Sequence, residues 1–156
     1  WQELLAKGAD FGVKPIGLGA RDTLRTEMKY SLYGHEITDV TNPYEAGLGW
    51  AVKSDKKDFV GRDKIMAAKE KGLKRKLVGF VMQDRGIARA EYKLFDSTGH
   101  EIGFVTSGTP SPSTGDNIGI GYVTLPKASE DSEIFVDIRG RKVKARVCKT
   151  PFVNKK

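Results

Sequence analysis

The chain has little of the chemistry that builds disulfides and metal centres. Its 156 residues contain one cysteine, Cys148, and two histidines, His35 and His100. A single cysteine cannot form an internal disulfide, which is compatible with a reducing compartment. Each histidine lies in a turn-like context beside a glycine, without a second ligand at metal-site spacing, so metal catalysis is a poor hypothesis. Cys148 falls on the polar side of an alternating run, and we interpret it as structural; a nucleophilic role is the alternative.

Long apolar runs are also missing. No stretch approaches the ~20 apolar residues that a membrane-spanning helix needs. The first eight residues resemble the middle of an amphipathic helix and lack the basic-then-apolar order of a signal peptide. The hydrophobic fraction of 38% still allows a real core. The chain begins with Trp1 instead of Met. We therefore expect a soluble fragment of a longer protein, with no membrane partner.

The net charge of +7 suggests a nucleic-acid hypothesis. However, the basic residues are spread over 53–57, 69–76 and 139–149, usually with Asp or Glu nearby. No aromatic-lined strand or known nucleic-acid motif accompanies them. We interpret the charge as a solvated basic surface and expect no nucleic-acid partner. A non-catalytic basic binding module is the alternative from another functional class.

Periodicity predicts an α+β fold with a mixed first part and a β-rich second part. Helices are expected to end near Gly8, to span about 20–28 with Leu24 and Met28 as an apolar stripe, and to end before Gly72. An extended stretch is expected at 47–52. A polar connector at 69–76 marks the domain boundary, which divides the chain into residues 1–73 and 74–156.

Six short strands are expected in the second part, and they predict a small antiparallel barrel or jelly roll. Gly119 and Gly121 indicate a strand that curves or approaches another backbone. Because residues 107–115 contain two prolines and many small residues, they predict a fixed surface loop. The expected strands are 76–82, 92–96, 101–106, 117–124, 133–138 and 142–149.

Arg21 is the sharpest candidate for chemistry. It follows Gly17 and Gly19 near a helix start, where a guanidinium can bind a carboxylate or planar heterocycle through two hydrogen bonds. The glycines alone are a weak nucleotide motif, because the third glycine of a dinucleotide fingerprint is absent. From the residues alone, a structural ion pair of Arg21 is the stronger hypothesis. Its expected partner is one of three nearby acids: Asp22, Glu27 or Glu45.

Several blocks in order resemble the T-proteins of the glycine cleavage system, the aminomethyltransferase family. Residues 17–27 (GLGARDTLRTE) and 31–36 (SLYGHE) resemble the G-L-x-A-R-D-x-L-R-x-E and L-Y-G-x-[DE] blocks of that family. Further blocks cover essentially the whole chain: 42–50 (NPYEAGLGW), 57–62 (KDFVGR), 103–112 (GFVTSGTPSP), 117–123 (NIGIGYV) and 151–153 (PFV). Five further matches in family order make chance agreement implausible.

The resemblance implies a function and a site. It implies transfer of a one-carbon unit from the aminomethyl-lipoyl H-protein to tetrahydrofolate, used as a substrate, with release of ammonia. Residues 1–73 would be the end of the folate-binding catalytic region, and residues 74–156 the C-terminal barrel. Arg21 would bind folate, and Arg25 would be structural. The positive surface could attract folate tails or an acidic carrier protein. The location would be cytoplasmic in a bacterium or mitochondrial in a eukaryote.

The chain also departs from the family pattern. Thr26, Met28 and Lys29 replace the usual Leu, Ala and Gly. Whether Lys155 or Lys156 reaches folate is open. The aspartate that assists transfer belongs to the N-terminal half of the family and has no match here, so no catalytic residue is expected and the fragment alone should be inactive. Related alternatives are a folate-dependent demethylating oxidase and a folate-binding tRNA-modification factor.

Overall fold

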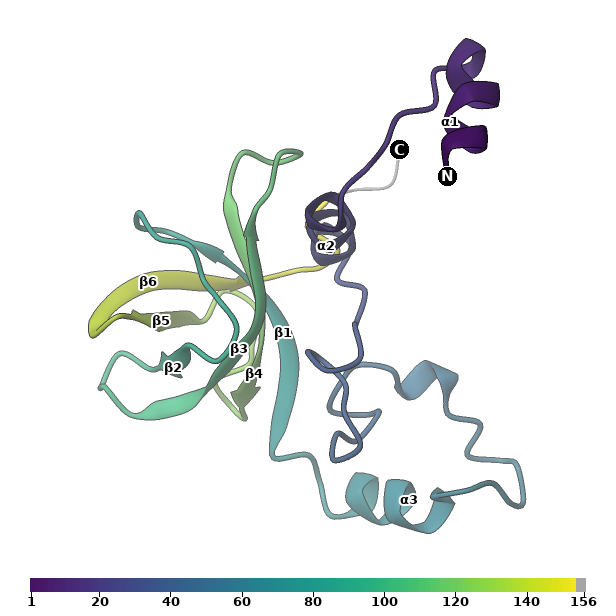
Figure 1. The fold of residues 1–156 in the computed structure, drawn as a ribbon. Coiled ribbons are helices and arrows are strands. Elements are labelled where there is room, and N and C mark those ends of the chain that lie inside the picture. The colour runs from purple at the N-terminus through teal and green to yellow at the C-terminus, as the bar shows by residue number, and fades with distance from the viewer. Residues whose placement is uncertain (154–156) are drawn as a thin grey trace.

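The computed structural model describes residues 1–153 and has an α+β fold. Three helices, α1 (Gln2–Gly8), α2 (Leu18–Glu27) and α3 (Arg62–Glu70), precede six strands (Figure 1). The strands are β1 (Arg75–Met82), β2 (Lys93–Phe95), β3 (Glu101–Pro110), β4 (Asn117–Thr124), β5 (Glu133–Ile138) and β6 (Arg141–Cys148). Each of the six expected strands is present.

The strands form a closed antiparallel barrel in the order β1-β4-β3-β2-β5-β6, which decides between the two expected β architectures. Alternation of side chains builds its core, as in β6, where Val143, Ala145 and Val147 are buried. The β4 glycines are needed for close approach. A Cβ on Gly119 would lie 2.3 Å from the Phe80 ring, and one on Gly121 would lie 2.6 Å from the Phe104 carbonyl oxygen.

The helices follow the sequence signals, with one correction between them. α3 ends before Gly72, as expected, and the φ of +80° at Gly72 suits a residue without a Cβ. The extended stretch expected at 47–52 is wrong, because Gly49–Ala51 form a 3₁₀ turn. A Cβ on Gly49 would lie 2.6 Å from the Tyr44 ring, so this turn packs closely on the segment before it.

Strand β3 is longer than expected and corrects the prediction of a surface loop at 107–115. It runs to Pro110, paired with β4 as far as Asn117. Ser107, Thr109 and Ser111 are all buried. The proline did not stop the strand because it occupies the last position, where the missing N–H interrupts little of the ladder.

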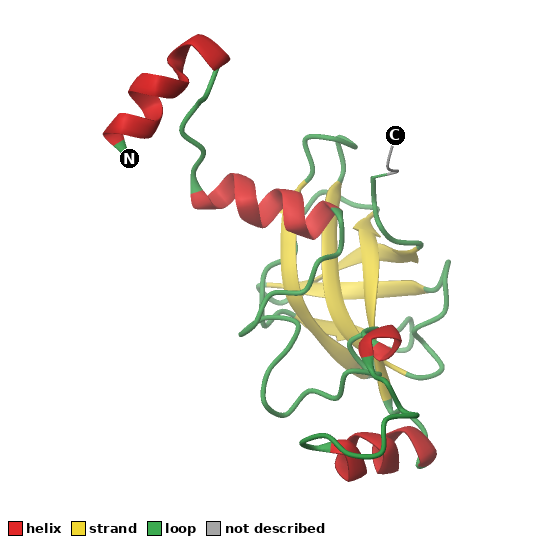
Figure 2. Ribbon diagram, turned by 90° about the vertical axis from the view of Figure 1, so that its right-hand side faces the viewer, coloured by secondary structure: helices red, strands yellow, loops and turns green. Residues whose placement is uncertain are grey.

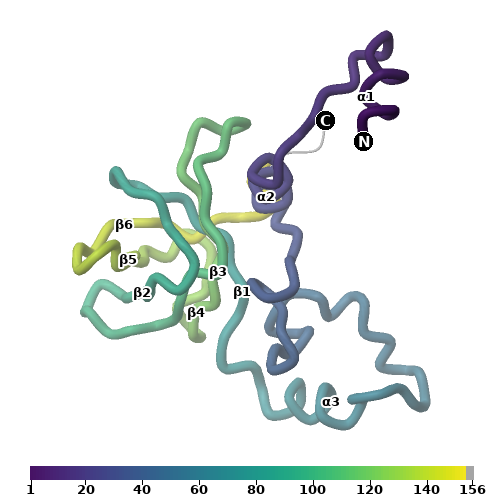
Figure 3. Tube along the Cα trace, viewed as in Figure 1, coloured from purple at the N-terminus to yellow at the C-terminus, as the bar shows by residue number. Residues whose placement is uncertain are grey.

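α2 lies across the barrel beside β3 and β4 (Figure 2). Its C-terminal half covers the strands, whereas its N-terminal half extends beyond them toward α1. The chain contacts α2 again near the C-terminal end of the described residues. After β6 the backbone turns toward α2 (Figure 3), and the Phe152 N–H donates to the Glu27 carbonyl oxygen at 2.9 Å. No helix within residues 1–153 is long and apolar enough to cross a membrane.

Candidate functional site

α2 packs on the barrel through polar residues. Its buried positions are Arg25, Thr26 and Glu27, while Leu24 is 59% exposed. The apolar stripe expected from Leu24 and Met28 therefore does not form the contact face. Helices usually bury an apolar face, so the hydrophobic pattern predicted the wrong buried face for this helix.

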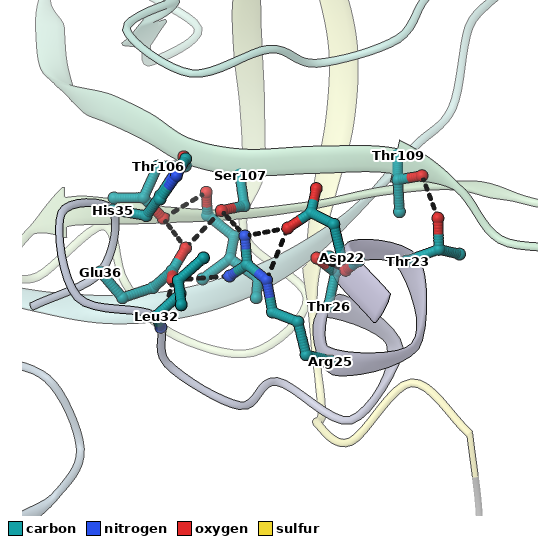
Figure 4. A network of polar contacts seen from close by, with 11 residues as sticks. Asp22, Thr23, Arg25, Thr26, Leu32, His35, Glu36, Thr106, Ser107 and Thr109 are labelled. Atoms are coloured by element: carbon teal, nitrogen blue, oxygen red, sulfur yellow. Dashed lines mark hydrogen bonds and ion pairs between the residues drawn. The ribbon is translucent and has the colours of Figure 1, made fainter. Parts of the chain in front are cut away.

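The buried face of α2 is centred on an ion pair between Arg25 and Glu36 (Figure 4). Arg25 Nη1 donates to Glu36 Oε2 at 2.6 Å, and Arg25 Nη2 donates to Ser107 Oγ at 2.7 Å. Asp22 accepts from the outer edge of the same guanidinium at 2.6 and 2.8 Å. The structural role expected for Arg25 is confirmed.

Glu36 is buried and has its acceptor sites filled. Its carboxylate accepts hydrogen bonds from the Leu32 N–H at 3.0 Å, Thr106 Oγ1 at 2.8 Å and Ser107 Oγ at 2.6 Å. Two adjacent β3 residues reach one carboxylate because the ladder with β4 shifts register between Val105 and Ser107. Such an irregularity re-aims side chains that would otherwise point to opposite faces. Glu36 thus joins the loop after α2 to the barrel.

Glu27 makes the second buried contact with the barrel. Its carboxylate accepts from Ser111 Oγ at 2.6 Å, from the Ser113 N–H at 3.1 Å and from Ser113 Oγ at 2.9 Å. Burial raises the pKa of Glu27, but the hydrogen bonds from Ser111 and Ser113 outweigh it and leave that pKa below its usual value. Glu27 therefore holds the C-terminal end of α2 on the segment after β3.

Arg21 is exposed on α2. The three acids expected as its structural partners bind other groups. Asp22 pairs with Arg25, Glu45 pairs with Arg75 at 3.1 Å, and Glu27 binds the two serines. Among residues 1–153, none of the ion pairs includes Arg21. The expected structural ion pair is therefore wrong for the described residues.

Four arginines surround an open hollow of about 830 Å³ at one end of the barrel. Two come from the loop between β1 and β2 and two from the β5–β6 hairpin: Arg85, Arg89, Arg139 and Arg141. Within the described chain, none of the ion pairs includes these four groups. Tyr92, Ile87 and Ile138 also line the hollow, so apolar surface adjoins the positive charge. We call these residues the arginine hollow.

Lys29 and Cys148 line a smaller hollow of about 220 Å³ beside β1. Lys29 stands at φ +52° directly after the helix C-cap, and its Nζ donates to the Leu77 carbonyl oxygen at 3.1 Å. Burial, together with the nearby Lys76, lowers the pKa of Lys29. Burial raises the pKa of Cys148 to about 11. A thiol of this kind is a poor nucleophile, which supports the structural interpretation of Cys148.

The histidines occupy separate places. His35 Nδ1 lies 3.4 Å from the Thr106 carbonyl oxygen, and His100 Nδ1 lies 2.7 Å from Thr98 Oγ1 in the β2–β3 turn. In residues 1–153 no group of three or more His, Cys, Asp or Glu side chains could hold a metal ion.

Sequence reasoning missed Glu36 and the serine and threonine side chains of β3 as parts of this interface. A signal for the latter was present. Hydroxyl residues recur at every second position from 107 to 113, as expected for one face of an extended segment. The role predicted for Lys155 or Lys156 concerns positions outside the described residues.

Comparison with known proteins gives a consistent result over both parts of the chain. Residues 75–154 match the family model described as the glycine cleavage T-protein C-terminal barrel domain, and residues 1–56 match the GCVT N-terminal domain. A protein named aminomethyltransferase from Bdellovibrio bacteriovorus is 61% identical over 99% of this chain and 43% of its own length. Another of that name from Flavobacterium psychrophilum is 50% identical over the same shares.

A solved structure is also similar. The glycine cleavage system aminomethyltransferase T from Bartonella henselae superposes with a TM-score of 0.90 at 38% identity, covering 97% of this chain and 43% of that one. The present chain thus spans less than half the length of the relatives that it matches.

Proposed function

Since the chain belongs to the glycine cleavage T-protein family, we propose that it is part of an aminomethyltransferase. The whole enzyme would accept an aminomethyl group carried on the lipoyl arm of the H-protein. It would transfer the one-carbon unit to tetrahydrofolate and release ammonia. The curated relatives named above are aminomethyltransferases, which favours this activity over a demethylating oxidase or a tRNA-modification factor.

We propose that Arg21 binds tetrahydrofolate. The observation that supports this role is an exposed guanidinium whose three nearby acids are all engaged elsewhere. A free arginine fork can bind a carboxylate or the edge of a heterocycle through two hydrogen bonds. Its contribution would be to position the folate, which is the main task in a transfer between two bound partners. The carboxylate that assists transfer would come from the part of the relatives that this chain does not span.

We propose a division into residues 1–73, the end of the folate-binding region, and residues 74–156, the barrel domain. The first part exposes a series of large apolar side chains that a packed neighbour would cover. These are Trp1, Leu4, Phe11, Val13, Ile16 and Leu18. The proposed neighbour is the remainder of the catalytic region, and the proposed location is the cytoplasm of a bacterium.

The arginine hollow is the proposed docking surface for the acidic carrier, the H-protein. Arginine and tyrosine are enriched among the residues that dominate binding energy at interfaces. Four guanidinium groups without carboxylate partners in the described chain would also steer an acidic protein during encounter. Arg139 holds a φ of +55° in its hairpin, a conformation that asparagine or glycine adopts at lower cost. An arginine at that position is consistent with a binding role.

Tetrahydrofolate binding by the full-length enzyme, wild type beside Arg21→Ala at fixed ionic strength, tests the folate role. We expect about tenfold weaker binding in the variant, roughly 1.4 kcal/mol. Unchanged binding would show that Arg21 is not a folate ligand, and absent binding by the wild type would refute the transferase proposal.

The carrier surface needs a separate test. Arg85→Glu and Arg89→Glu should raise the KM for H-protein, more strongly at low salt, while folate affinity stays unchanged. Lys56→Glu is the matched control, because it makes the same charge change at an exposed residue remote in sequence from the hollow. An equal rise in KM in the control would refute the docking surface.

A further inference from the structure

We infer that the hydroxyl side chains of β3 and the loop after it are positioning residues for Arg21. By fixing α2 on the barrel, they set how tightly Arg21 binds folate. We call this set the β3 hydroxyl row: Ser107, Thr109, Ser111 and Ser113. The inference rests on the folate role of Arg21 proposed above, which it deepens.

The β3 hydroxyl row contacts α2 along the buried side of the helix. Thr109 Oγ1 lies 3.2 Å from Thr23 Oγ1 (Figure 4). Ser107 accepts from Arg25, as described above. Ser111 and Ser113 both donate to the carboxylate of Glu27. Thr23, Arg25 and Glu27 of α2 are therefore each held by a hydroxyl of this row.

These contacts do not extend to Arg21, which precedes Thr23 on α2. The helix is anchored from Thr23 to Glu27, and its N-terminal half extends past the strands (Figure 2). Arg21 lies six residues before Glu27, about 9 Å along the helix axis. With the Glu27 contacts weakened, a tilt of about 10° around the Arg25 contacts, about 6 Å along the axis from Arg21, would move the Arg21 backbone by about 1 Å. Displacements of that size are large enough to weaken a positioned contact.

The hydrogen bonds from the row to Glu27 are the contacts best suited to a test. Glu27 is 3% exposed, so its carboxylate depends on protein donors in place of water. Ser113 is exposed and supplies two of the three hydrogen bonds, one from its hydroxyl and one from its backbone. Ser113→Ala removes only the hydroxyl at a surface position. The fold should therefore survive while the helix gains freedom to tilt.

The experiment is a double-mutant cycle on the full-length enzyme, with tetrahydrofolate affinity as the readout. Ser113→Ala, alone and combined with Ser111→Ala, is measured with Arg21 present and in the Arg21→Ala background. With Arg21 present we expect about fivefold weaker binding. In the Arg21→Ala background we expect no further loss, because the group that the row positions is already gone.

Two controls separate positioning from general loosening. Ser113→Thr keeps the hydroxyl and should bind tetrahydrofolate with wild-type affinity, unlike Ser113→Ala. Thr98→Ala removes another hydroxyl–carboxylate bond, the one from Thr98 to Asp96 at 2.6 Å in the β2–β3 turn. That turn is not part of the α2 interface, so its loss should leave folate affinity unchanged.

Each outcome decides between the two proposals. Equal loss in both Arg21 backgrounds, or a matching loss in Thr98→Ala, would overturn the positioning role. Unchanged affinity in the serine variants beside a weakened Arg21→Ala would overturn it while the folate role stands. Failure of the wild type to bind tetrahydrofolate would overturn both.

Discussion

Replacing Arg25 by methionine tests how much of the contact between α2 and the barrel depends on buried charge. The guanidinium faces a fully buried carboxylate, that of Glu36, and a half-exposed one, that of Asp22. Methionine keeps much of the side-chain volume but leaves Glu36 buried without its counter-ion. Breaking a buried pair in this way typically costs 3–5 kcal/mol, because the remaining charge is uncompensated.

The structure places the expected cost at the lower end of that range. Glu36 would keep three other donors, the Leu32 N–H and the Thr106 and Ser107 hydroxyls. We therefore expect a loss of about 3 kcal/mol for Arg25→Met. Asp22→Ala should cost under about 1 kcal/mol, because that carboxylate is half exposed and its ion pair is screened by water.

Urea unfolding of the full-length enzyme, followed by circular dichroism, measures both variants against wild type. The difference is taken from midpoints only where the slopes agree. A third variant, Arg25→Met with Glu36→Leu, removes both charges and should recover part of the loss of the single variant. The reasoning would be refuted by an Arg25→Met cost below about 1 kcal/mol, or by an Asp22→Ala cost equal to it.

Three further predictions follow from single residues. Lys29→Ala should be less stable than Lys29→Gly by about 1 kcal/mol in thermal unfolding, because φ is +52° and both variants lose the bond to Leu77; equal stability would contradict the backbone argument. Because burial raises the pKa of Cys148 to about 11, its alkylation at pH 8 should be at least about tenfold slower in the native enzyme than in urea, and equal rates would show an accessible thiolate. The hydrogen bond from Thr98 lowers the pKa of Asp96 from 3.8 to about 2, so its contribution to stability is complete above pH 3.8 and is lost as the pH falls toward 2. Asp96→Asn should therefore flatten the decline in melting temperature between pH 4 and 2, and an unchanged acid decline would argue against that shift.

The barrel could be predicted closely from the sequence because its signals are local. β4 and β5 have the expected bounds, 117–124 and 133–138, since each is a short, mostly apolar run with turn residues on both sides. The end of α3 before Gly72 could be predicted equally well, because a glycine after a helical pattern is a strong signal for the left-handed residue that ends a helix. Such features depend on neighbours within a few residues and need no knowledge of the tertiary fold.

The candidate site could be predicted only in part, because its contacts join residues far apart in the chain. Hydrophobic periodicity assigns a helix face by its apolar residues, yet α2 buries Arg25 and Glu27 and exposes Leu24. The expectation that Arg21 pairs with one of three acids failed for a local reason at Asp22, which pairs with Arg25 on the same helix, and for tertiary reasons at the other two. Each of those acids is claimed by a better-placed partner, as Glu45 is by Arg75 across 30 positions.

A polar contact between α2 and the barrel has a physical consequence for how the region can move. Apolar burial is non-directional, whereas Glu36 and Glu27 are fixed by hydrogen bonds with defined directions. Shifting the helix by one position would separate Glu36 from its counter-ion Arg25 and Glu27 from its serine donors, at a cost of several kcal/mol. α2 and the barrel should therefore behave as one rigid unit.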